Sequence, residues 1–362
     1  MGAAAAHYHQ TQLGIIEHNQ SKKERPLLEA TMKERPKILV TQKVPDPAYP
    51  ILEAIGDVEA NMEEGSIWPY EELLRRGPGH DYIYSLLTDN IDAKFLETCA
   101  ASTPRLKMVA NMAVGFNNID VEVATRLGIA VSNTPGVLSD TTADLAFALL
   151  MATARRIPEA ERYLRAGKYK GWGPLLFCGA EVHGSTLGLI GAGRIGKIMA
   201  NRARGFDMKM IYYDIYRILP EEETAYNVTY MDMEEVLRQA DFISIHTPYM
   251  PATHHLIGER ELHMMKPSAI LINTARGPIV DEKALVRALQ TKTIAGAGLD
   301  VFENEPAVEP ELLTMENVVL LPHIASASLK TRTLMATMAS DNIAAHFRGE
   351  PPPNIVNPEV LN

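Results

Sequence analysis

Short apolar runs alternate with amphipathic segments along the chain from about Pro36 onward. Runs of about four to eight residues rich in β-branched and aromatic side chains are typical of buried strands. The first third of the chain contains four of them: KILVTQ, YIYSLL, LKMVAN and IAVSN. Segments with helical spacing of apolar residues separate these runs, and such alternation indicates a parallel sheet covered on both faces. The pattern predicts an α/β domain in this part of the chain.

A second alternating series begins near residue 185. Its six candidate strands are STLGLI, KMIYYD, FISIHT, AILINT, AGAGLD and VVLLPH, with helical patterns such as MEEVLRQA between them. Six parallel strands with intervening helices are typical of a doubly wound nucleotide-binding domain. The predicted fold class is therefore α/β, with two doubly wound parallel-sheet domains.

Two longer helical patterns lie outside these series. The segment SDTTADLAFALLMATARR, beginning at Ser139, has an almost continuous apolar side, which predicts burial between domains or between subunits. Ser139, Asp140 and Thr141 offer oxygens that can cap its first turn. The last pattern, at about 329–347, ends at a glycine and three prolines and has no strand partner of its own. It is expected to pack back on the first domain, which would make the second domain an insertion.

Composition narrows the class of protein. The chain has 362 residues, a formal net charge of -10 and two cysteines far apart in sequence. An acidic chain is unsuited to binding nucleic acid or an anionic membrane surface, and no stretch approaches the roughly 20 apolar residues of a membrane span. The cysteines have neither metal-ligand spacing nor a disulfide pattern, so we expect no metal site and a cytoplasmic location. We interpret residues 1–36, which differ in composition from the rest, as a mobile extension.

The stretch GLIGAGRIGKIMA contains glycines at positions 191, 193 and 196, with Arg194 and Ile195 between the last two. A G-x-G-x-x-G alone is a weak signal, but here an apolar strand precedes it and a helical pattern follows it. In that context Gly191 allows a tight turn, Gly193 lets the backbone approach a pyrophosphate, and Gly196 lets the helix pack on the strand. The loop therefore predicts dinucleotide binding.

Asp214 follows the next strand, 18 residues beyond Gly196. A carboxylate at about this distance bonds the ribose hydroxyls of NAD and repels the 2′-phosphate of NADP, so NADH is favoured over NADPH. Arg217 weakens this preference, because it lies three residues later and can reach a phosphate. The alternative is a structural glycine-rich loop followed by a turn aspartate, which we consider much less favoured.

Charged side chains follow three of the predicted strands of the second domain. Arg276, Asp300 and His323 each come at or just after a strand end, with Glu303 and Glu305 close behind Asp300. Ligands of open parallel sheets bind outside the carboxyl ends of the strands, so these groups can face one crevice. An arginine binds a carboxylate, a histidine transfers a proton, and a glutamate can orient it. Singly, each has a structural alternative in an ion pair, a packed histidine or a solvated loop charge, and spacing does not choose between the glutamates.

These motifs together resemble the D-isomer-specific 2-hydroxyacid dehydrogenase family. The matching segments are LGLIGAGRIG, LINTARGPIVDE, AGLDVFENEP and LLPHIAS, and the resemblance extends from about Pro36 to Asn357. Within the family, MAVGFNNID and GAEVHGSTLGLIG look most like glyoxylate/hydroxypyruvate reductases. The resemblance implies a Rossmann NAD-binding domain, residues 135–324, inserted in a split flavodoxin-like catalytic domain, residues 37–134 and 325–362.

The resemblance also implies roles for individual residues. Arg276 would bind the substrate carboxylate together with the backbone amides of Val114 and Gly115. His323 would be the acid–base residue, and Glu305, the residue before Pro306, would keep it protonated. Asp300 would contact the nicotinamide amide. Further residues would lie along the cofactor: Thr142, His246, Thr247, Pro248, Thr274 and Ala275.

The predicted function is the NAD(P)H-dependent reduction of a small 2-oxo acid, such as glyoxylate or hydroxypyruvate, to the D-2-hydroxy acid. The family implies a homodimer, for which the helix beginning at Ser139 is the candidate surface. Alternatives within the fold are D-lactate-type, formate and phosphite dehydrogenases. An alternative of another class is a non-catalytic NAD(H)-sensing interaction protein, which the complete set of Arg276, Glu305 and His323 argues against.

Overall fold

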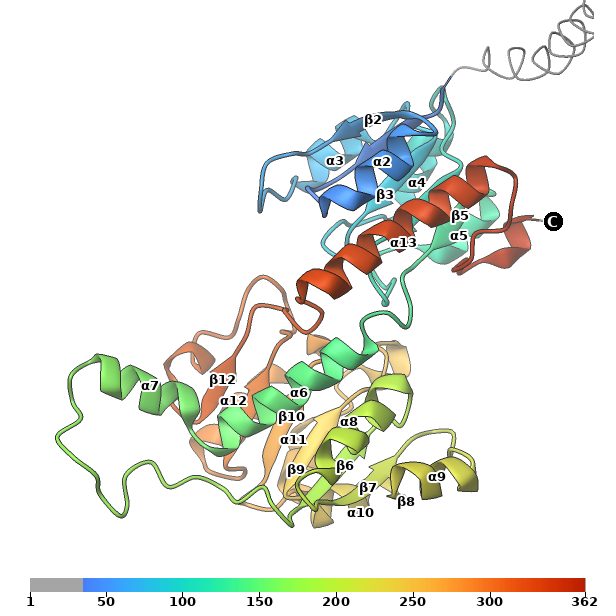
Figure 1. Ribbon diagram of the computed structural model, residues 1–362. Helices are drawn as coiled ribbons and strands as arrows, with labels where there is room; N and C mark the ends of the chain where they lie inside the picture. Colours follow the sequence, from blue (N-terminus) through green and yellow to red (C-terminus); the bar gives the residue numbers. More distant parts are fainter. Residues whose placement is uncertain (1–34, 362) are drawn as a thin grey trace, which may run out of the picture.

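The computed structural model describes residues 35–361. It contains two parallel sheets, each the centre of its own α/β domain, and the two domains lie one above the other in Figure 1. The predicted mobile extension of residues 1–36 lies outside the described residues except for its last two. Among residues 35–361, no helix is both long and apolar enough to cross a membrane, and no three His, Cys, Asp or Glu side chains group as metal ligands.

The first sheet has five parallel strands in the order β2-β1-β3-β4-β5, the flavodoxin-like order. They are β1 (Lys37–Val40), β2 (Asp57–Ala60), β3 (Tyr82–Ser85), β4 (Met108–Asn111) and β5 (Ala130–Ser132). The four predicted strands are confirmed. The pattern missed β2, because this edge strand has the sequence DVEA and is half exposed rather than apolar.

Helices of the first domain lie between these strands: η2 (Asp46–Ala48), α2 (Tyr49–Glu53), α3 (Tyr70–Arg76), α4 (Ala93–Ala100) and α5 (Val121–Arg126). The long helix α13 (Leu329–Phe347) crosses the same sheet, as Figure 1 shows in red beside the blue and cyan elements. Its side chains Met335, Ala339 and Ile343 belong to the core formed by β1, β3 and β4. The Tyr84 hydroxyl donates to the carbonyl of Ala336 at 3.1 Å. The expectation that this helix packs on the first domain is confirmed.

The second sheet has seven parallel strands in the order β12-β11-β10-β9-β6-β7-β8. Six were predicted, and they are β6 (Thr186–Ile190), β7 (Lys209–Tyr213), β9 (Phe242–Ile245), β10 (Ile270–Asn273), β11 (Gly296–Leu299) and β12 (Val318–Leu320). The seventh, β8 (Val228–Tyr230), is a three-residue edge strand too short to give a periodic signal. The order reverses between β6 and β9, which is the switch point where doubly wound folds bind ligands.

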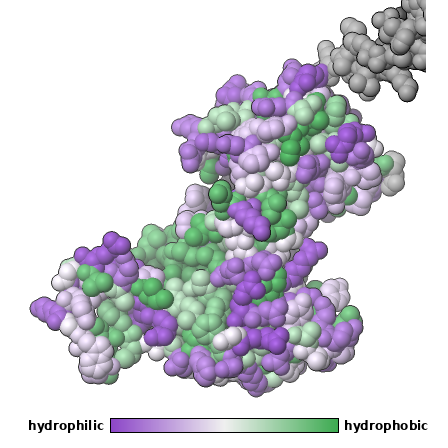
Figure 2. All heavy atoms as spheres, viewed as in Figure 1, coloured by the Kyte–Doolittle hydropathy of each residue, from purple (hydrophilic) through white to green (hydrophobic). Residues whose placement is uncertain are grey.

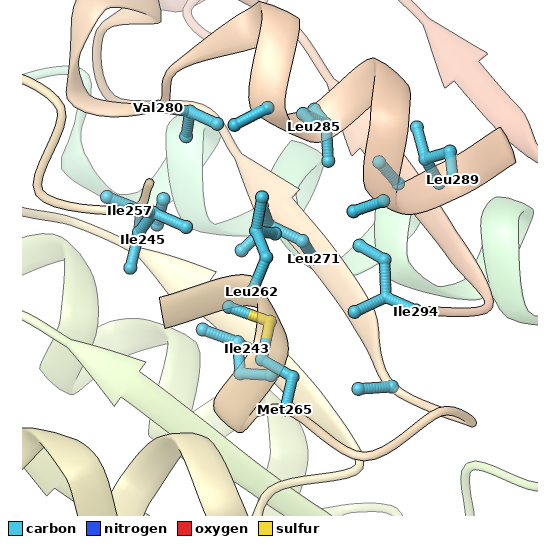
Figure 3. Close-up of a cluster of buried hydrophobic side chains, with 14 of the residues drawn as sticks. Ile243, Ile245, Ile257, Leu262, Met265, Leu271, Val280, Leu285, Leu289 and Ile294 are labelled. Carbon is cyan, nitrogen blue, oxygen red and sulfur yellow. The ribbon is translucent and has the colours of Figure 1, made fainter. Parts of the chain in front are cut away.

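Helices cover both faces of the second sheet. Those in chain order are α6 (Ser139–Ala154), α7 (Ile157–Arg165), α8 (Arg194–Arg204), α9 (Pro220–Tyr226), α10 (Met233–Gln239), α11 (Glu259–Met264) and α12 (Glu282–Gln290). On one face α6 and α8 close a core over β6 and β7. On the other, α10, α11 and α12 pack on β9 and β10, and Figure 3 shows Leu262 and Leu285 converging there on Leu271. The fold class, with a Rossmann domain inserted in a split flavodoxin-like domain, is confirmed.

The start of α6 differs from its prediction. No side chain caps this helix, and the residue at its N-cap is Leu138, which already has helical backbone angles. A capping serine or threonine needs an extended backbone at that position, so Ser139 and Thr141 cannot serve. The Thr141 hydroxyl instead shares a 2.6 Å hydrogen bond with that of Thr331 in α13. This bond joins α6 and α13, each of which follows a point where the chain crosses from one domain to the other.

Candidate active site

A cavity of about 570 Å³ lies between the two domains, at the carboxyl ends of the strands. Residues of both domains line it. Many of the predicted residues line it: Val114, Gly115, Thr142, Arg194, Ile195, His246, Thr247, Pro248, Thr274, Ala275, Arg276 and His323. The structure thus brings together groups that are up to 209 positions apart in the sequence (Val114 to His323).

The glycine loop lies between β6 and α8, beside the cavity, which two residues of this stretch, Arg194 and Ile195, line. Gly191 has a φ of +100°, which favours glycine, and a Cβ there would lie 2.8 Å from the carbonyl carbon of His246. A Cβ at Gly193 would meet no atom within 4 Å, so this side of the loop is open to a ligand. The free amides at the start of α8 then favour an anionic group. The loop has the geometry that its sequence predicts.

Asp214 lies directly after β7, beneath the glycine loop. Its Oδ2 accepts a hydrogen bond from the backbone N–H of Ala192 at 2.8 Å, and its Oδ1 accepts one from Tyr216 at 3.2 Å. Arg217 is turned toward α9, where its guanidinium makes two 2.8 Å bonds to the carboxylate of Glu223. It also stacks on Tyr230, 5.4 Å from the ring centroid.

Several polar groups in the cavity fit a dinucleotide. The hydroxyl oxygens of Thr247 and Thr274 are buried and have no hydrogen-bond partner within residues 35–361. Such groups are costly unless a ligand satisfies them. Burial lowers the pKa of His246 to about 4, so its ring is neutral at pH 7, and it bonds Ser244 at 2.9 Å. The neutral ring beside the glycine loop adds no charge to the anion site.

His323 and Glu305 form a hydrogen-bonded pair at the end of β12. The His323 Nδ1 lies 2.9 Å from Oε2 of Glu305, and the other oxygen of Glu305 accepts the backbone N–H of Phe302 at 3.0 Å. Burial by itself would raise the pKa of Glu305. His323, the Phe302 amide and Arg276 outweigh that effect, so the pKa lies below its ordinary value. The hydrogen bond to an ionised Glu305 fixes the orientation of the imidazole ring.

Asp300 holds the turn that presents His323. This side chain is fully buried, and its two oxygens accept the backbone N–H groups of Ile324 and Ala325, both at 2.8 Å. The Asp300 carbonyl accepts the N–H of His323 at 2.9 Å. These bonds stabilise His323 at a φ of +54°, a conformation that non-glycine residues rarely adopt. Burial raises the pKa of Asp300, and the two amides oppose that effect. Its contact with a nicotinamide amide stays a prediction.

Arg276 reaches across the cavity to the first domain. Its Nη1 donates to the Ala275 carbonyl at 2.7 Å and its Nε to Oδ1 of Asn117 at 3.4 Å. The guanidinium lies so close to Gly115 that a Cβ there would overlap it. Asn273 donates to the Arg276 carbonyl at 2.9 Å and steadies the loop. Burial lowers the pKa of Arg276, with Glu305 opposing that effect.

Asn117 and Arg332 are among the cavity residues that the sequence did not predict. Asn117 follows Val114 and Gly115 in AVGFNN, so its proximity to them was a usable signal. Arg332, in the first turn of α13, also lines the cavity, and its buried Nε has no partner within residues 35–361. The sequence around Arg332 gives no signal of this role, because Arg332 reaches the cavity only through the packing of α13 on the first domain. The structure also separates the two glutamates: Glu305 bonds His323, whereas Glu303 bonds His255.

Comparison with known proteins identifies the family of this chain. Residues 147–325 match the model of the D-isomer specific 2-hydroxyacid dehydrogenase NAD binding domain. The chain is 48% identical over 331 residues to a glyoxylate reductase of Thermococcus litoralis, covering 90% of this chain and 98% of that protein. A solved structure from Thermus thermophilus has a TM-score of 0.81 and 41% identity, covering 88% of this chain and 99% of the other.

An NADPH-dependent glyoxylate/hydroxypyruvate reductase from Sinorhizobium meliloti, solved in complex with NADP and malonate, is also similar. It has a TM-score of 0.77 and 34% identity, covering 90% of this chain and 98% of that chain. The fold and the cavity define an oxidoreductase that binds a nicotinamide cofactor. The chain belongs to the D-isomer-specific 2-hydroxyacid dehydrogenase family, and it is an NAD(P)-dependent dehydrogenase.

Proposed function

We propose that this enzyme reduces small 2-oxo acids, glyoxylate or hydroxypyruvate, to D-2-hydroxy acids with NADH. One observation carries the proposal. The cavity beside the glycine loop is lined both by a cation for a carboxylate, Arg276, and by a carboxylate-paired proton donor, His323. The relatives named as glyoxylate reductases, at up to 48% identity, support this choice of substrate.

In the proposed mechanism one group of residues binds the substrate and another supplies the proton. Arg276 and the backbone amides of Val114 and Gly115 bind the substrate carboxylate, and Arg276 also polarises the carbonyl. A bound dihydronicotinamide would supply the hydride that C2 accepts. His323 donates its proton to the oxygen that develops negative charge, and Glu305 stabilises the imidazolium before the transfer. Holding these groups in place contributes much of the acceleration.

We also propose that the other predicted residues contact the cofactor. Thr247 and Thr274 carry the unpartnered buried hydroxyls, which supports their assignment. Those proposed on the basis of their position in or beside the cavity are Thr142, Arg194, Ile195, His246, Pro248, Ala275 and Asp300. The domain limits at 134/135 and 324/325 belong to the same proposal, since the chain crosses between the sheets near these positions.

NADH is proposed as the preferred cofactor because of how Asp214 and Arg217 are held. The carboxylate of Asp214 is fixed under the glycine loop by Ala192, where it would face the adenosine ribose. Arg217, the cation nearest to it in sequence that can reach a 2′-phosphate, donates through its Nε and Nη2 to the two carboxylate oxygens of Glu223. The complex of the Sinorhizobium meliloti relative with NADP shows that the family includes the other preference.

The experiment that tests the function is a substrate panel. Glyoxylate, hydroxypyruvate and pyruvate are each assayed with NADH and NADPH, and phosphite and formate are assayed with NAD. Turnover of glyoxylate or hydroxypyruvate with higher kcat/KM than pyruvate is expected, and NADH should exceed NADPH. Turnover of phosphite or formate alone would contradict the proposal. Tight NADH binding without turnover of any substrate would indicate an NAD(H)-sensing protein.

A homodimer is proposed, with α6 at its centre. Leu145, Ala148 and Met151 of α6 are all at least partly exposed, although Met151 also packs against the core beneath the helix. Figure 2 shows hydrophobic surface over this helix. The adjoining arm, defined here as residues 157–178, projects beyond the sheet in Figure 1 and exposes Trp172 (83%) and Leu175 (86%). A helix that is apolar all round is normally buried, and a second subunit would bury this one.

A cytoplasmic location is proposed from the cysteines. Cys99 is buried and Cys178 is exposed, and neither forms a disulfide in the described part of the chain. Unpaired thiols are typical of proteins of the reducing cytosol.

A further inference from the structure

Two glutamates join the loop after β10 to the loop after β11. Glu282, the first residue of α12, is 3% exposed, and its Oε1 accepts the backbone N–H of Glu303 at 2.5 Å. In return, Oε2 of Glu303 accepts the backbone N–H of Glu282 at 3.2 Å. Each side chain satisfies the other's backbone, so the two loops are held in one relative position.

His255 adds the loop after β9 to this arrangement. Its Nε2 lies 2.8 Å from Oε1 of Glu303, and its backbone N–H donates to the carbonyl of Pro278 at 2.8 Å. The residue has a φ of +50° and its ring stacks on His254, with centroids 3.9 Å apart. His255, Glu282 and Glu303 are called the carboxylate clamp below.

The loops that the clamp joins carry the proposed catalytic groups. Arg276 lies six residues before Glu282, and Glu305 lies two residues after Glu303. Gly277 packs so closely on the backbone of Phe302 that a Cβ at this glycine would overlap its carbonyl group. The position of Arg276 relative to Glu305 therefore depends on the clamp and on the contact between Gly277 and Phe302. None of the three clamp residues lines the cavity itself.

We propose that the carboxylate clamp holds Arg276 at its working distance from the Glu305–His323 pair, which makes His255 and Glu303 positioning residues for the reaction. This inference rests on the proposed function. Because the clamp acts through Arg276, its loss should weaken substrate binding and slow turnover together. Cofactor affinity should fall less than substrate affinity, because the glycine loop, which is proposed to bind the pyrophosphate, follows β6 and lies outside the clamped loops.

The test compares His255→Leu with His255→Gln, which keeps a donor for Glu303. The side chain of His255 is 36% exposed, so either substitution should leave the fold intact. His263→Leu is the matched control, because His263 is an exposed histidine of the same domain that bonds the carbonyl of Glu259. The readouts are kcat and KM for glyoxylate, the Kd of NADH, the Tm, and the Kd of oxamate, which has a carboxylate beside a carbonyl, on the NADH-loaded enzyme.

We expect His255→Leu to lower kcat/KM by about 10-fold to 100-fold, the range that a small displacement of a positioning group can produce. Oxamate binding should weaken more than NADH binding, the Tm should match the wild type, and His255→Gln should recover most of the loss. Unchanged oxamate affinity in His255→Leu, equal losses in Leu and Gln variants, or a loss shared by His263→Leu would overturn the clamp. Absence of 2-oxo acid turnover by the wild type would instead overturn the proposed function, with the oxamate comparison still deciding the clamp.

Discussion

At the scale of single residues, the pair of Glu305 and His323 should make the activity of the site depend on pH. The pKa of Glu305 lies below its ordinary value, so the carboxylate stays ionised as the pH falls until that lowered pKa is passed. The charge of Glu305 stabilises the folded state and the imidazolium fully at pH values above the ordinary carboxyl pKa of about 4.3. This stabilisation is lost at pH values below the lowered pKa of the folded state. Reduction consumes a proton through His323, so activity should fall at the alkaline end.

Glu305→Gln should move the alkaline limb of the kcat/KM profile to lower pH. The amide keeps a hydrogen bond to His323 but no longer places a negative charge beside its imidazolium. The measurement is the pH dependence of glyoxylate reduction in both enzymes. An alkaline limb in the same place would mean that Glu305 does not support the protonated form of His323.

Glu223→Gln should raise the use of NADPH. The charged bidentate bond to Arg217 would be replaced by a weaker one, leaving the guanidinium free to meet a 2′-phosphate. Titration with NADPH should show an affinity increase of about 10-fold, while NADH affinity stays the same. The double variant with Arg217→Ala is the control and should lose the gain. An unchanged NADPH affinity in the single variant would show that Asp214 alone sets the preference.

The sequence identified the residues of the site better than their partners. Arg276, Glu305 and His323 were predicted because each follows a strand of a parallel sheet, whose carboxyl ends meet at one edge. The choice of Glu305 over Glu303 needed the family resemblance, and the structure supplies the geometric reason, a 2.9 Å bond to His323. Arg332 and the clamp residue His255 were missed, since their roles depend on contacts between distant loops.

At the scale of elements, α13 holds the split domain together. Ile343 is fully buried between this helix and the first sheet. Ile343→Ala should lower the free energy of unfolding by about 2–5 kcal/mol, because it removes three buried carbons and leaves a cavity. Denaturant unfolding followed by circular dichroism measures this cost. Leu329→Ala, at an exposed position (86%) of the same helix, should cost little. Equal effects of the two changes would mean that α13 is not docked as described.

Elements with strong periodicity were predicted, and short or polar ones were not. The ten predicted strands are present, whereas the edge strands β2 and β8 were missed because they lack a run of apolar residues. The cap of α6 was predicted wrongly, since Leu138 already has helical angles and the serine that follows lies inside the helix. Edge strands and caps depend on neighbouring elements, which a periodicity does not show.

At the scale of the whole molecule, the arm of residues 157–178 should decide the assembly. Replacing Trp172 and Leu175 by serine should raise the dimer dissociation constant by about 10²-fold, because large apolar side chains dominate such interfaces. Sedimentation equilibrium gives this constant directly. Met62→Ser, at an exposed apolar residue (56%) of the first domain, controls for a general change of solubility. A wild type that sediments as a monomer at all concentrations would contradict the proposed homodimer.

His323 and Arg276 line the same cavity between the two domains, and the proposed function depends most on His323 as the proton donor. His323→Gln is the most direct test, measured as kcat for glyoxylate reduction beside the Kd of NADH. We predict that kcat falls by about 100-fold or more, in line with the loss of a general acid, while NADH binding is retained. A kcat within a few-fold of the wild-type value, with the variant fully folded, would contradict the assignment of His323 as the proton donor.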